Sequence, residues 1–369
     1  MRLVFWHNCL SPHQLPYVIN LMDDKRVDEV IFAAPFAVLN ERKAMGWSTT
    51  EDEVEKCGVK VVLNPSDDEI CTILKARPED SYHIFGGISG GGKFVFRSLQ
   101  LSMLYPLHRA VVAERPNGYW FKWGFRIPKP GWMHRIKFLL KDYKYAQNIE
   151  KLFAMGTDAL TYYKSLGQKW TVFTFAYCTD IKLKEVPPIV DDSLHFLFCG
   201  SLIPTKDPVR IIKAFAMLKA DKCDVAFIGD GELRGYMEQY AKRDRLDGRL
   251  YFLGIKPQSE VPIYMQQRDV LILPSIYDGW GAVVNEALQC GCYVICSDAC
   301  GSSDLIRKDK RLGLVFHRGN SKQLADCMLW CTDHLDEIRL GRGFRRQWSE
   351  DHISGSVIAK YLVDCLVKD

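Results

Sequence analysis

The chain has 369 residues, 47% of them hydrophobic and 25% charged, which is typical of a globular protein and longer than one compact core, so two domains are expected. No apolar run approaches the roughly 18 residues that span a bilayer, and the hydrophobic start at residues 1–8 is too short for a signal peptide. The net charge of +4 is uneven, because residues 120–145 carry seven basic residues against one acid, or +6, and the remainder sums to −2.

Short β-type runs alternate with helical patterns along the first half of the chain. Many of these runs are continuously apolar, which is typical of parallel strands covered on both faces. The predicted strands of the first half are residues 2–6, 29–34, 59–63, 82–87 and 110–114.

The same alternation continues in the second half, where helices with apolar residues at helical spacing are predicted at 207–220 and 232–245. The predicted strands there are residues 195–200, 223–229, 249–254, 269–275 and 293–298. Alternating strands and helices predict doubly wound α/β sheets. Two prolines and an acidic pair at residues 184–192 mark a linker between the two series.

The loops after the strands matter because ligands of open α/β sheets bind beyond the carboxyl ends of the strands. The loop after the first strand holds His7, His13 and Gln14. A glycine-rich loop, Gly86–Gly92, follows the fourth strand. Its backbone suits close approach to a sugar or phosphate, and the alternative is a flexible connection.

Glu114 and Arg115 end the next predicted strand. The carboxylate of Glu114 is a candidate for orienting a substrate hydroxyl group. The alternative is a structural salt bridge.

Residues 133–146 form an amphipathic pattern inside the basic segment, with Ile136, Leu139, Leu140 and Tyr143 on one helical face. The pattern suits docking of residues 120–145 on an anionic membrane surface. The alternative is a core helix with a solvated basic face. The sequence contains no nucleic-acid recognition module.

Lys206 stands just ahead of a helix that is predicted to begin near Asp207, with Pro208 at its first position. The ammonium group and the free backbone amides there favour an anion such as phosphate. The alternative is a solvated loop lysine.

The stretch SIYDGWGAVVNEALQCG, residues 275–291, carries two acids around a glycine-containing turn. The amides of Gly279–Ala282 suit an anion. Asp278 lies in the loop and Glu286 one to two turns into the helix, so the two do not share a proton. They suit hydroxyl groups on either side of a bound phosphate, because a carboxylate accepts two hydrogen bonds from a diol. The alternative is that Asp278 caps the helix and Glu286 is solvated or salt-bridged.

Thirteen cysteines, an odd number without a regular framework, favour reduced thiols in the cytoplasm. Four of them are close in sequence, but their spacing matches no zinc template, so buried thiols are expected rather than a metal site. These four are Cys290, Cys292, Cys296 and Cys300.

From His195 to Asp304 the chain resembles the C-terminal domain of retaining GT-B glycosyltransferases of family 4. The landmarks are CGSLIPTKDPVRIIKAFAML, AFIGDGELRGYMEQYA, YDGWGAVVNEALQCGCYVICSD and CGSSDLI, in this order. The final RRQWSEDHISGSVIAKYLVDCL is similar to the terminal helix of that family. The resemblance implies two Rossmann-like domains facing across a cleft, with residues 1–186 binding the acceptor, 187–345 binding the nucleotide sugar, and 346–369 crossing back to the first domain.

Position by position, the resemblance assigns Lys206 to the donor diphosphate, Asp278 to the transferred sugar and Glu286 to the ribose hydroxyl groups. Glu114 lies near where the family keeps a histidine facing the reaction centre, so the catalytic candidates are Asp278, Lys206 and Glu114. The remaining donor-binding candidates are Gly200, Ser201, Gly279, Trp280, Gly281 and Ala282, and the acceptor-side candidates are His7, His13 and Gly87.

The chain departs from the family pattern at two positions. Asp278 is one methylene shorter than the family's glutamate, which implies a different position of the sugar or a different sugar. Ser201 stands where the family has an arginine, so compensation of the leaving diphosphate rests on Lys206 with help from Arg210 or Lys256.

The predicted function is transfer of a hexose from a nucleotide sugar to a glycan or lipid-linked saccharide, with retention of configuration, in surface polysaccharide biosynthesis. No metal, cofactor or nucleic acid is expected. The alternatives are a GT-B nucleotide-sugar epimerase and a catalytically inactive nucleotide-sugar-binding subunit. The expected location is the cytoplasm, at the inner face of the membrane.

Overall fold

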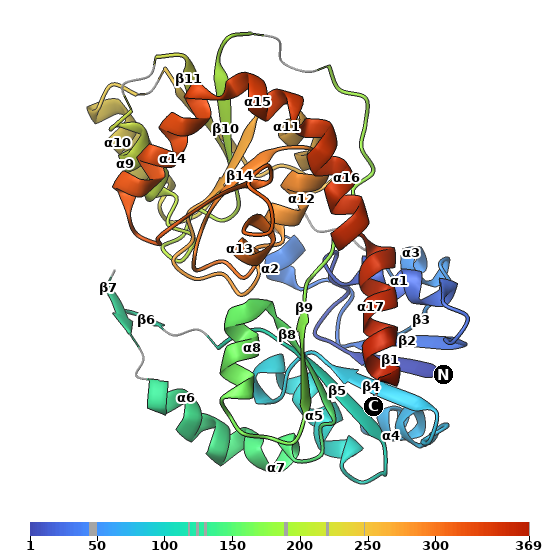
Figure 1. The fold of residues 1–369 in the computed structure, drawn as a ribbon. Helices are drawn as coiled ribbons and strands as arrows, with labels where there is room; N and C mark the ends of the chain where they lie inside the picture. The colour runs from blue at the N-terminus through green and yellow to red at the C-terminus, as the bar shows by residue number, and fades with distance from the viewer. Residues whose placement is uncertain are drawn as a thin grey trace. The chain divides into compact units, whose positions relative to one another are not determined.

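A computed structural model describes residues 1–43, 50–116, 119–122, 125–128, 131–187, 191–218, 221–246 and 248–368, without the side chains of residues 41, 42 and 117–131. The chain divides into two compact units, shown in Figure 1. The first comprises Met1–Lys43, Ser48–Thr179 and Ile353–Asp369, and the second comprises Asp180–His352. Residues 188–190 of the predicted linker lie outside the described part of the chain.

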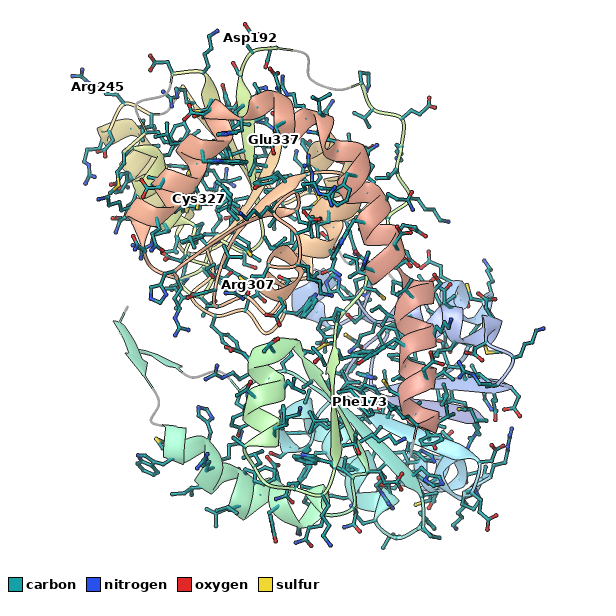
Figure 2. All side chains as sticks on the ribbon, in the orientation of Figure 1. Phe173, Asp192, Arg245, Arg307, Cys327 and Glu337 are labelled. Carbon is teal, nitrogen blue, oxygen red and sulfur yellow. The ribbon has the colours of Figure 1, made fainter. Side chains whose placement is uncertain are left out.

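The first unit is built on a parallel sheet with the strand order β3-β2-β1-β4-β5-β8-β9. Two of its strands, β8 and β9, were not predicted from the sequence. Phe173 of β9 stacks on Phe153 of β8 with ring centres 5.6 Å apart (Figure 2). The strands are β1 Arg2–Trp6, β2 Glu29–Ala34, β3 Lys60–Leu63, β4 Ser81–Phe85, β5 His108–Ala113, β8 Lys151–Met155 and β9 Thr171–Phe175.

Helices connect the parallel strands of the first unit, and two of them begin with reciprocal caps. Ser66 accepts a hydrogen bond from the amide of Glu69, whose carboxylate accepts one from the amide of Ser66, and Thr50 and Glu53 repeat this arrangement. The helices of this unit are α1 Leu15–Asn20, α2 Asn40–Lys43, α3 Glu51–Glu55, α4 Asp67–Lys75, α5 Lys93–Ser102, α6 Gly131–Lys137, α7 Tyr143–Ala146, α8 Gly156–Lys164 and α17 Gly355–Val367.

A short hairpin and a helical segment connect β5 with β8. The hairpin pairs β6 (Tyr119–Lys122) with β7 (Phe125–Pro128) in antiparallel fashion. One π-helical turn, Phe138–Asp142, joins α6 to α7. The structure does not describe three basic side chains of the predicted basic segment, those of Lys122, Arg126 and Lys129.

The second unit also has a parallel sheet, with the order β12-β11-β10-β13-β14-β15. Its strands are β10 Leu194–Cys199, β11 Cys223–Ile228, β12 Leu250–Gly254, β13 Val270–Leu273, β14 Tyr293–Ser297 and β15 Gly313–Phe316. The first five agree with the predicted strands, and β15 was not predicted. The α/β fold with two doubly wound sheets is therefore confirmed.

The helices of the second unit pack on this sheet around a core that includes Phe196, Phe198 and Phe227, and the labelled Cys327 lies partly buried against that core (Figure 2). They are α9 Val209–Phe215, α10 Arg234–Arg243, α11 Val261–Gln266, α12 Val283–Gln289, α13 Ser303–Ile306, α14 Ser321–Asp333, α15 Leu335–Leu340 and α16 Arg342–Ile353. The predicted helix at 346–369 is two helices, α16 and α17, because Ser354 between them is extended.

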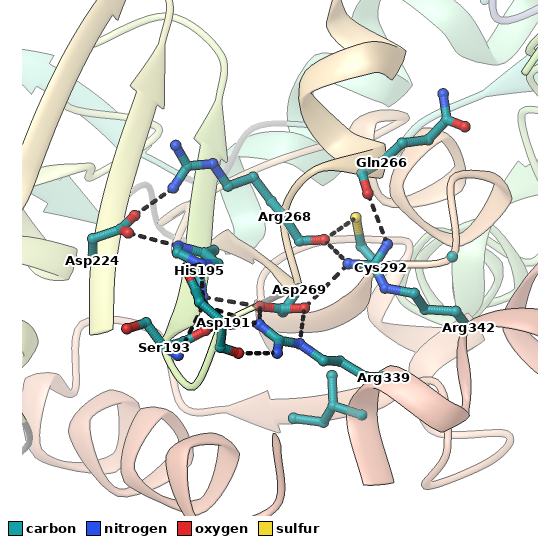
Figure 3. A network of polar contacts seen from close by, with 12 residues as sticks. Asp191, Ser193, His195, Asp224, Gln266, Arg268, Asp269, Cys292, Arg339 and Arg342 are labelled. Atoms are coloured by element: carbon teal, nitrogen blue, oxygen red, sulfur yellow. Dashed lines mark hydrogen bonds and ion pairs between the residues drawn. The ribbon is translucent and has the colours of Figure 1, made fainter. Parts of the chain in front are cut away.

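A polar network fixes the amino ends of the strands in the second unit (Figure 3). Asp269, buried just before β13, accepts hydrogen bonds from the amide of His195 at 3.1 Å, from Nε of Arg339 at 3.1 Å and from Arg342 at 3.2 Å. The His195 ring lies 2.6 Å from Asp224, and this hydrogen bond is the main cause of its raised pKa. These contacts tie α15 and α16 to the sheet at the end opposite to the carboxyl ends of the strands.

None of the helices formed by the described residues is both long enough and apolar enough to cross a membrane.

Candidate functional site

The carboxyl ends of β10 and β13 mark the point where the chain reverses its direction of travel across the second sheet. From β10 the chain moves outward through β11 to β12, whereas β13 returns to the other side of β10 and leads to β14 and β15. A crevice at such a switch point is where open α/β sheets bind ligands. The two loops that follow β10 and β13 contact each other there, since the amide of Ile276 donates to the carbonyl of Thr205 at 2.9 Å.

Lys206 and Asp278, two of the predicted catalytic residues, meet at this switch point. The Nζ atom of Lys206 lies 2.5 Å from Oδ2 of Asp278, although the residues are 72 positions apart. The lysine side chain is 29% exposed and the aspartate side chain 12%, so the pair is partly exposed to solvent, mainly through the lysine. A partly desolvated ion pair of this kind can exchange its carboxylate partner for a phosphate.

The backbone around Asp278 is held on both sides. Its amide donates to the carbonyl of Ala299 at 3.1 Å, and its carbonyl accepts from the amide of Gly301 at 3.3 Å. The loop after β14 therefore fixes the backbone from which the Asp278 carboxylate extends.

Gly281 has a left-handed backbone conformation, with φ +89°. A Cβ added there would lie 2.8 Å from Cδ2 of Leu273 and 3.1 Å from Oγ of Ser302. Both the conformation and the lack of space require glycine at this position. The neighbouring Trp280 buries its indole ring, whose Nε1 donates to Asn285 at 2.9 Å, so the contribution of Trp280 to a ligand is confined to its backbone.

Glu286 lies in the first turn of α12, closer to the start of the helix than the one to two turns that the sequence predicted. Burial raises the pKa of its carboxyl group to about 7, and its charge contributes, after burial, to the raised pKa of the Cys199 thiol at the end of β10. Gly200 follows Cys199 in the chain, and its carbonyl oxygen packs against Gly229. A Cβ added to Gly229 would lie 2.0 Å from that oxygen.

The two cations expected to compensate for Ser201 are held by other partners. Arg210 lies 2.9 Å from Asp207 and donates to Oγ of Ser321 at 3.0 Å. The ammonium of Lys256 lies 5.4 Å from the centre of the Tyr264 ring. Lys206 is the cation that the described contacts place against Asp278.

The first unit has its own switch point, between β1 and β4, and the predicted acceptor-side loops lie at it. His7 is buried, and desolvation lowers its pKa to about 3, so the imidazole is neutral. A Cβ on Gly86 would lie 2.6 Å from Nδ1 of His7, which shows that the two loops pack against each other. Gly87 has φ +113°, and a Cβ added there would lie 3.0 Å from Cα of Gly91, so the glycine-rich loop packs against itself.

His13 is half-buried in the loop after β1, and its carbonyl accepts a hydrogen bond from the amide of Cys178 at 3.3 Å. The loop after β1 is therefore joined to the segment that follows β9.

Glu114 shares a polar cluster with Gln14, which belongs to the predicted loop after the first strand, and with Tyr177, which the sequence did not indicate. The phenol of Tyr177 is hydrogen-bonded to the side chains of Glu114 and Gln14, and burial is the main cause of its raised pKa. Arg115 forms a 2.6 Å ion pair with Asp158. Tyr177 was missed because it follows β9, and its only signal in the sequence was the alternating run TVFTF before it.

The four cysteines considered for a metal are buried free thiols, and burial is the main cause of their raised pKa values. Across the described residues, no group of three or more histidine, cysteine or acidic side chains is arranged to hold a metal ion.

Residues 180–334 match the protein family described as glycosyl transferases group 1. Two relatives have informative names. One is the N-acetylgalactosamine-N,N'-diacetylbacillosaminyl-diphospho-undecaprenol 4-alpha-N-acetylgalactosaminyltransferase of Campylobacter jejuni, 26% identical over 145 residues, or 39% of each chain. The other is TuaC of Bacillus subtilis, a putative teichuronic acid biosynthesis glycosyltransferase, 25% identical over 223 residues, or 60% of this chain and 54% of TuaC.

The matches to several other curated relatives are also partial, because the chain spans less than half of their length. Among solved structures, HepE of Anabaena in complex with UDP is similar over 99% of both chains, with a TM-score of 0.73 and 14% sequence identity. At this identity the likeness shows the fold alone.

Proposed function

We propose that this chain, which has the GT-B fold and whose second unit belongs to the glycosyl transferases group 1, transfers a hexose from a nucleotide sugar to a saccharide acceptor. The observation that carries the proposal is the Lys206–Asp278 pair at the switch point of the second sheet, with Glu286 set back on α12. The Lys206 ammonium and the glycine-containing loop suit the diphosphate of an extended ligand. Asp278 suits its sugar, and Glu286 suits its ribose.

In this proposal, Lys206 exchanges Asp278 for the donor diphosphate, which leaves Asp278 available to accept hydrogen bonds from the sugar. Glu286, as a carboxylate, accepts two hydrogen bonds from the ribose hydroxyl groups. The amides of Gly279–Ala282 add dipoles along the ligand. Lys206 then offsets the charge that develops on the leaving diphosphate.

The proposed reaction retains the configuration at the anomeric carbon. The acceptor oxygen forms a bond to that carbon on the face from which the diphosphate leaves, and the acceptor proton passes to a phosphate oxygen of the leaving group. The products are the glycoside and a nucleoside diphosphate, and no metal takes part. Positioning and charge compensation provide most of the lowering of the barrier.

The proposed acceptor is a glycan or a lipid-linked saccharide, and the proposed process is the synthesis of a surface polysaccharide at the inner, cytoplasmic face of the membrane. Support comes from the names of the two relatives, one of which refers to a diphospho-undecaprenol-linked saccharide and the other to teichuronic acid.

The proposal is tested by incubating the full chain with a panel of nucleotide sugars, beginning with UDP-sugars because HepE was solved with UDP. We expect slow release of nucleoside diphosphate from one donor, and acceleration by lipid-linked saccharide. We expect Lys206→Ala to lower turnover on the order of 100-fold or more. Lys222→Ala, which removes a side chain that is 72% exposed in the same unit, serves as the control and keeps the wild-type rate.

Two outcomes would contradict the proposal. Donor binding without turnover, even with lipid-linked acceptors, would favour an inactive binding subunit. Conversion of one free nucleotide sugar into its epimer would favour an epimerase.

A further inference from the structure

One side of the segment from Trp132 to Tyr143 exposes five large apolar side chains to solvent. Their positions are spaced i, i+4, i+7, i+8 and i+11 along a segment that runs through α6, the π-helical turn Phe138–Asp142 and the start of α7. Each is between 41% and 80% exposed, and Leu140 is the most exposed. This apolar stripe consists of Trp132, Ile136, Leu139, Leu140 and Tyr143.

The opposite side of the same segment is packed on the first unit. Phe138 is buried, with its ring 6.0 Å from Trp170, and Tyr145 is buried with its ring 5.2 Å from Phe96. The amide of Ser89 donates to the carboxylate of Asp142 at 3.1 Å. The segment is therefore already held in place by its other face, and the alternative prediction of a core helix is wrong for the apolar stripe.

Basic side chains flank the apolar stripe. Arg135, Lys137, Lys141 and Lys144 are all exposed, and the one acid of this stretch, Asp142, is engaged with Ser89. The surface thus combines exposed apolar area with a net charge of +3 from these five residues. Both the apolar and the basic residues of this surface lie at Trp132 or later in the segment.

We infer that the apolar stripe and its flanking cations form a docking face for an anionic lipid bilayer. A helix that lies in the bilayer interface places its apolar side chains among the acyl chains and its basic side chains at the anionic headgroups. Long lysine side chains reach the headgroups while their methylene groups cover apolar surface. A lone apolar stripe gives weak binding, and the added charge supplies the second attraction that stable association requires.

The docking face is connected to the acceptor-side loop within the first unit. Asp142 holds the amide of Ser89, which lies in the glycine-rich loop between β4 and α5. Docking therefore brings the loop predicted to meet the acceptor to a defined distance from the membrane. This part of the inference rests on the proposed function, whereas the docking itself does not.

The docking is tested by sedimenting the full chain with vesicles of phosphatidylcholine, with or without phosphatidylglycerol. We expect binding to the anionic vesicles that weakens with added salt. Leu139→Asp combined with Leu140→Asp is expected to weaken it about tenfold or more. Leu104→Asp serves as the matched control, since Leu104 is 69% exposed in the same unit but outside the docking face, and it keeps wild-type binding.

The electrostatic part is tested with Lys141→Gln combined with Lys144→Gln. We expect a loss of binding on the order of 10- to 30-fold on anionic vesicles and no change on neutral ones. Thermal unfolding of all variants is expected to match the wild type, because each altered side chain is exposed.

Three results would overturn the inference: no binding of the wild type to anionic vesicles, equal binding by the Leu139/Leu140 variant, or a lipid-free dimer that this variant dissociates. The last would show that the face binds a second copy of the chain. Release of nucleoside diphosphate in the absence of lipid reports on the proposed function alone, so the two proposals fail separately.

Discussion

Asp278 and Glu286, eight residues apart, have different surroundings. Asp278 is neutralised by Lys206 at 2.5 Å, whereas burial at the crevice raises the pKa of Glu286 to about 7. An ordinary glutamate in water has a pKa near 4.3, so Glu286 gives up hydration in the folded chain. We interpret that loss as the consequence of a site shaped for a ligand whose hydroxyl groups replace water.

The raised pKa of Glu286 predicts a pH dependence of stability. Below the unfolded pKa the group is protonated in both states and has no effect. Between that pKa and about 7 the unfolded state ionises first, so the folded state loses stability as the pH rises. We expect Glu286→Gln to raise the unfolding temperature at pH 8 and to leave it unchanged at pH 4, measured by calorimetry.

Donor binding is expected to respond in the opposite direction from stability: Glu286→Gln stabilises the fold but weakens binding of the donor. The wild type should bind a nucleotide sugar more tightly as the pH rises through about 7, because the carboxylate accepts two hydrogen bonds. Glu286→Gln should bind weakly at every pH. Glu232→Gln, which alters an exposed carboxylate, is the control. A wild-type affinity that does not change with pH would refute the role of Glu286.

At the scale of elements, the crevice depends on loops that pass each other at backbone distance. A Cβ on Gly301 would lie 2.4 Å from the carbonyl of Gly279, so the loops after β13 and β14 touch through glycines. The conformation of each loop therefore depends on its packing against the neighbouring loop as well as on its own sequence.

Gly281→Ala tests this interpretation. The substitution combines a left-handed backbone conformation with crowding against Leu273, and we expect a loss of stability of about 1–3 kcal/mol together with loss of donor binding. Chemical denaturation and calorimetric titration measure the two effects.

Gly235→Ala is the matched control for the glycine substitution. Gly235 lies within α10, and a Cβ there meets nothing within 4 Å. Because alanine favours a helix by up to about 1 kcal/mol over glycine, this variant should be slightly more stable and should bind the donor normally. Equal behaviour of the two variants would show that Gly281 is not constrained.

At the scale of the whole molecule, the last helix belongs to the first unit. α17 buries Ile358, Leu362 and Leu366, and Lys151 of β8 donates to the carbonyls of Cys365, Leu366 and Lys368 at its end. A cation at these carbonyls suits the negative end of a helix. The amino-terminal sheet therefore depends on residues from the far end of the chain.

Leu362→Ala is predicted to destabilise the first unit by roughly 2–5 kcal/mol, since Leu362 is fully buried and leaves a cavity. Hydrogen exchange should show faster exchange in α1, which packs against α17, and unchanged exchange in α14 of the second unit. Lys360→Ala, which truncates an exposed side chain of the same helix, should change stability by less than about 0.5 kcal/mol. Equal loss of protection in α14 would show that the units do not respond separately.

Some features of the site and fold were not predictable from local patterns. β9 is only partly buried, so its pattern did not distinguish it from a loop, whereas β8 is as long as the predicted β1 and buried over four of its five residues, so its length does not explain why it was not predicted. The contacts of Asp269 with His195, Arg339 and Arg342 join residues 70 to 74 positions apart, and nothing in the sequence pairs them (Figure 3). The partnership of Tyr177 with Glu114 was hidden for the same reason.

The sequence by itself determined the α/β class, ten of the strands, the position of Lys206 and Asp278 in loops that follow strands, and the position of Glu286 on the next helix, because alternating apolar runs and helical periods are local properties of the chain. Only the tertiary structure decided that Lys206 lies against Asp278, that Arg210 and Lys256 have other partners, and that the apolar stripe from Trp132 to Tyr143 is exposed. These are distances between residues far apart in the chain, or the choice of which helical face meets the core. Both are fixed by the packing of the whole unit, which no local pattern encodes.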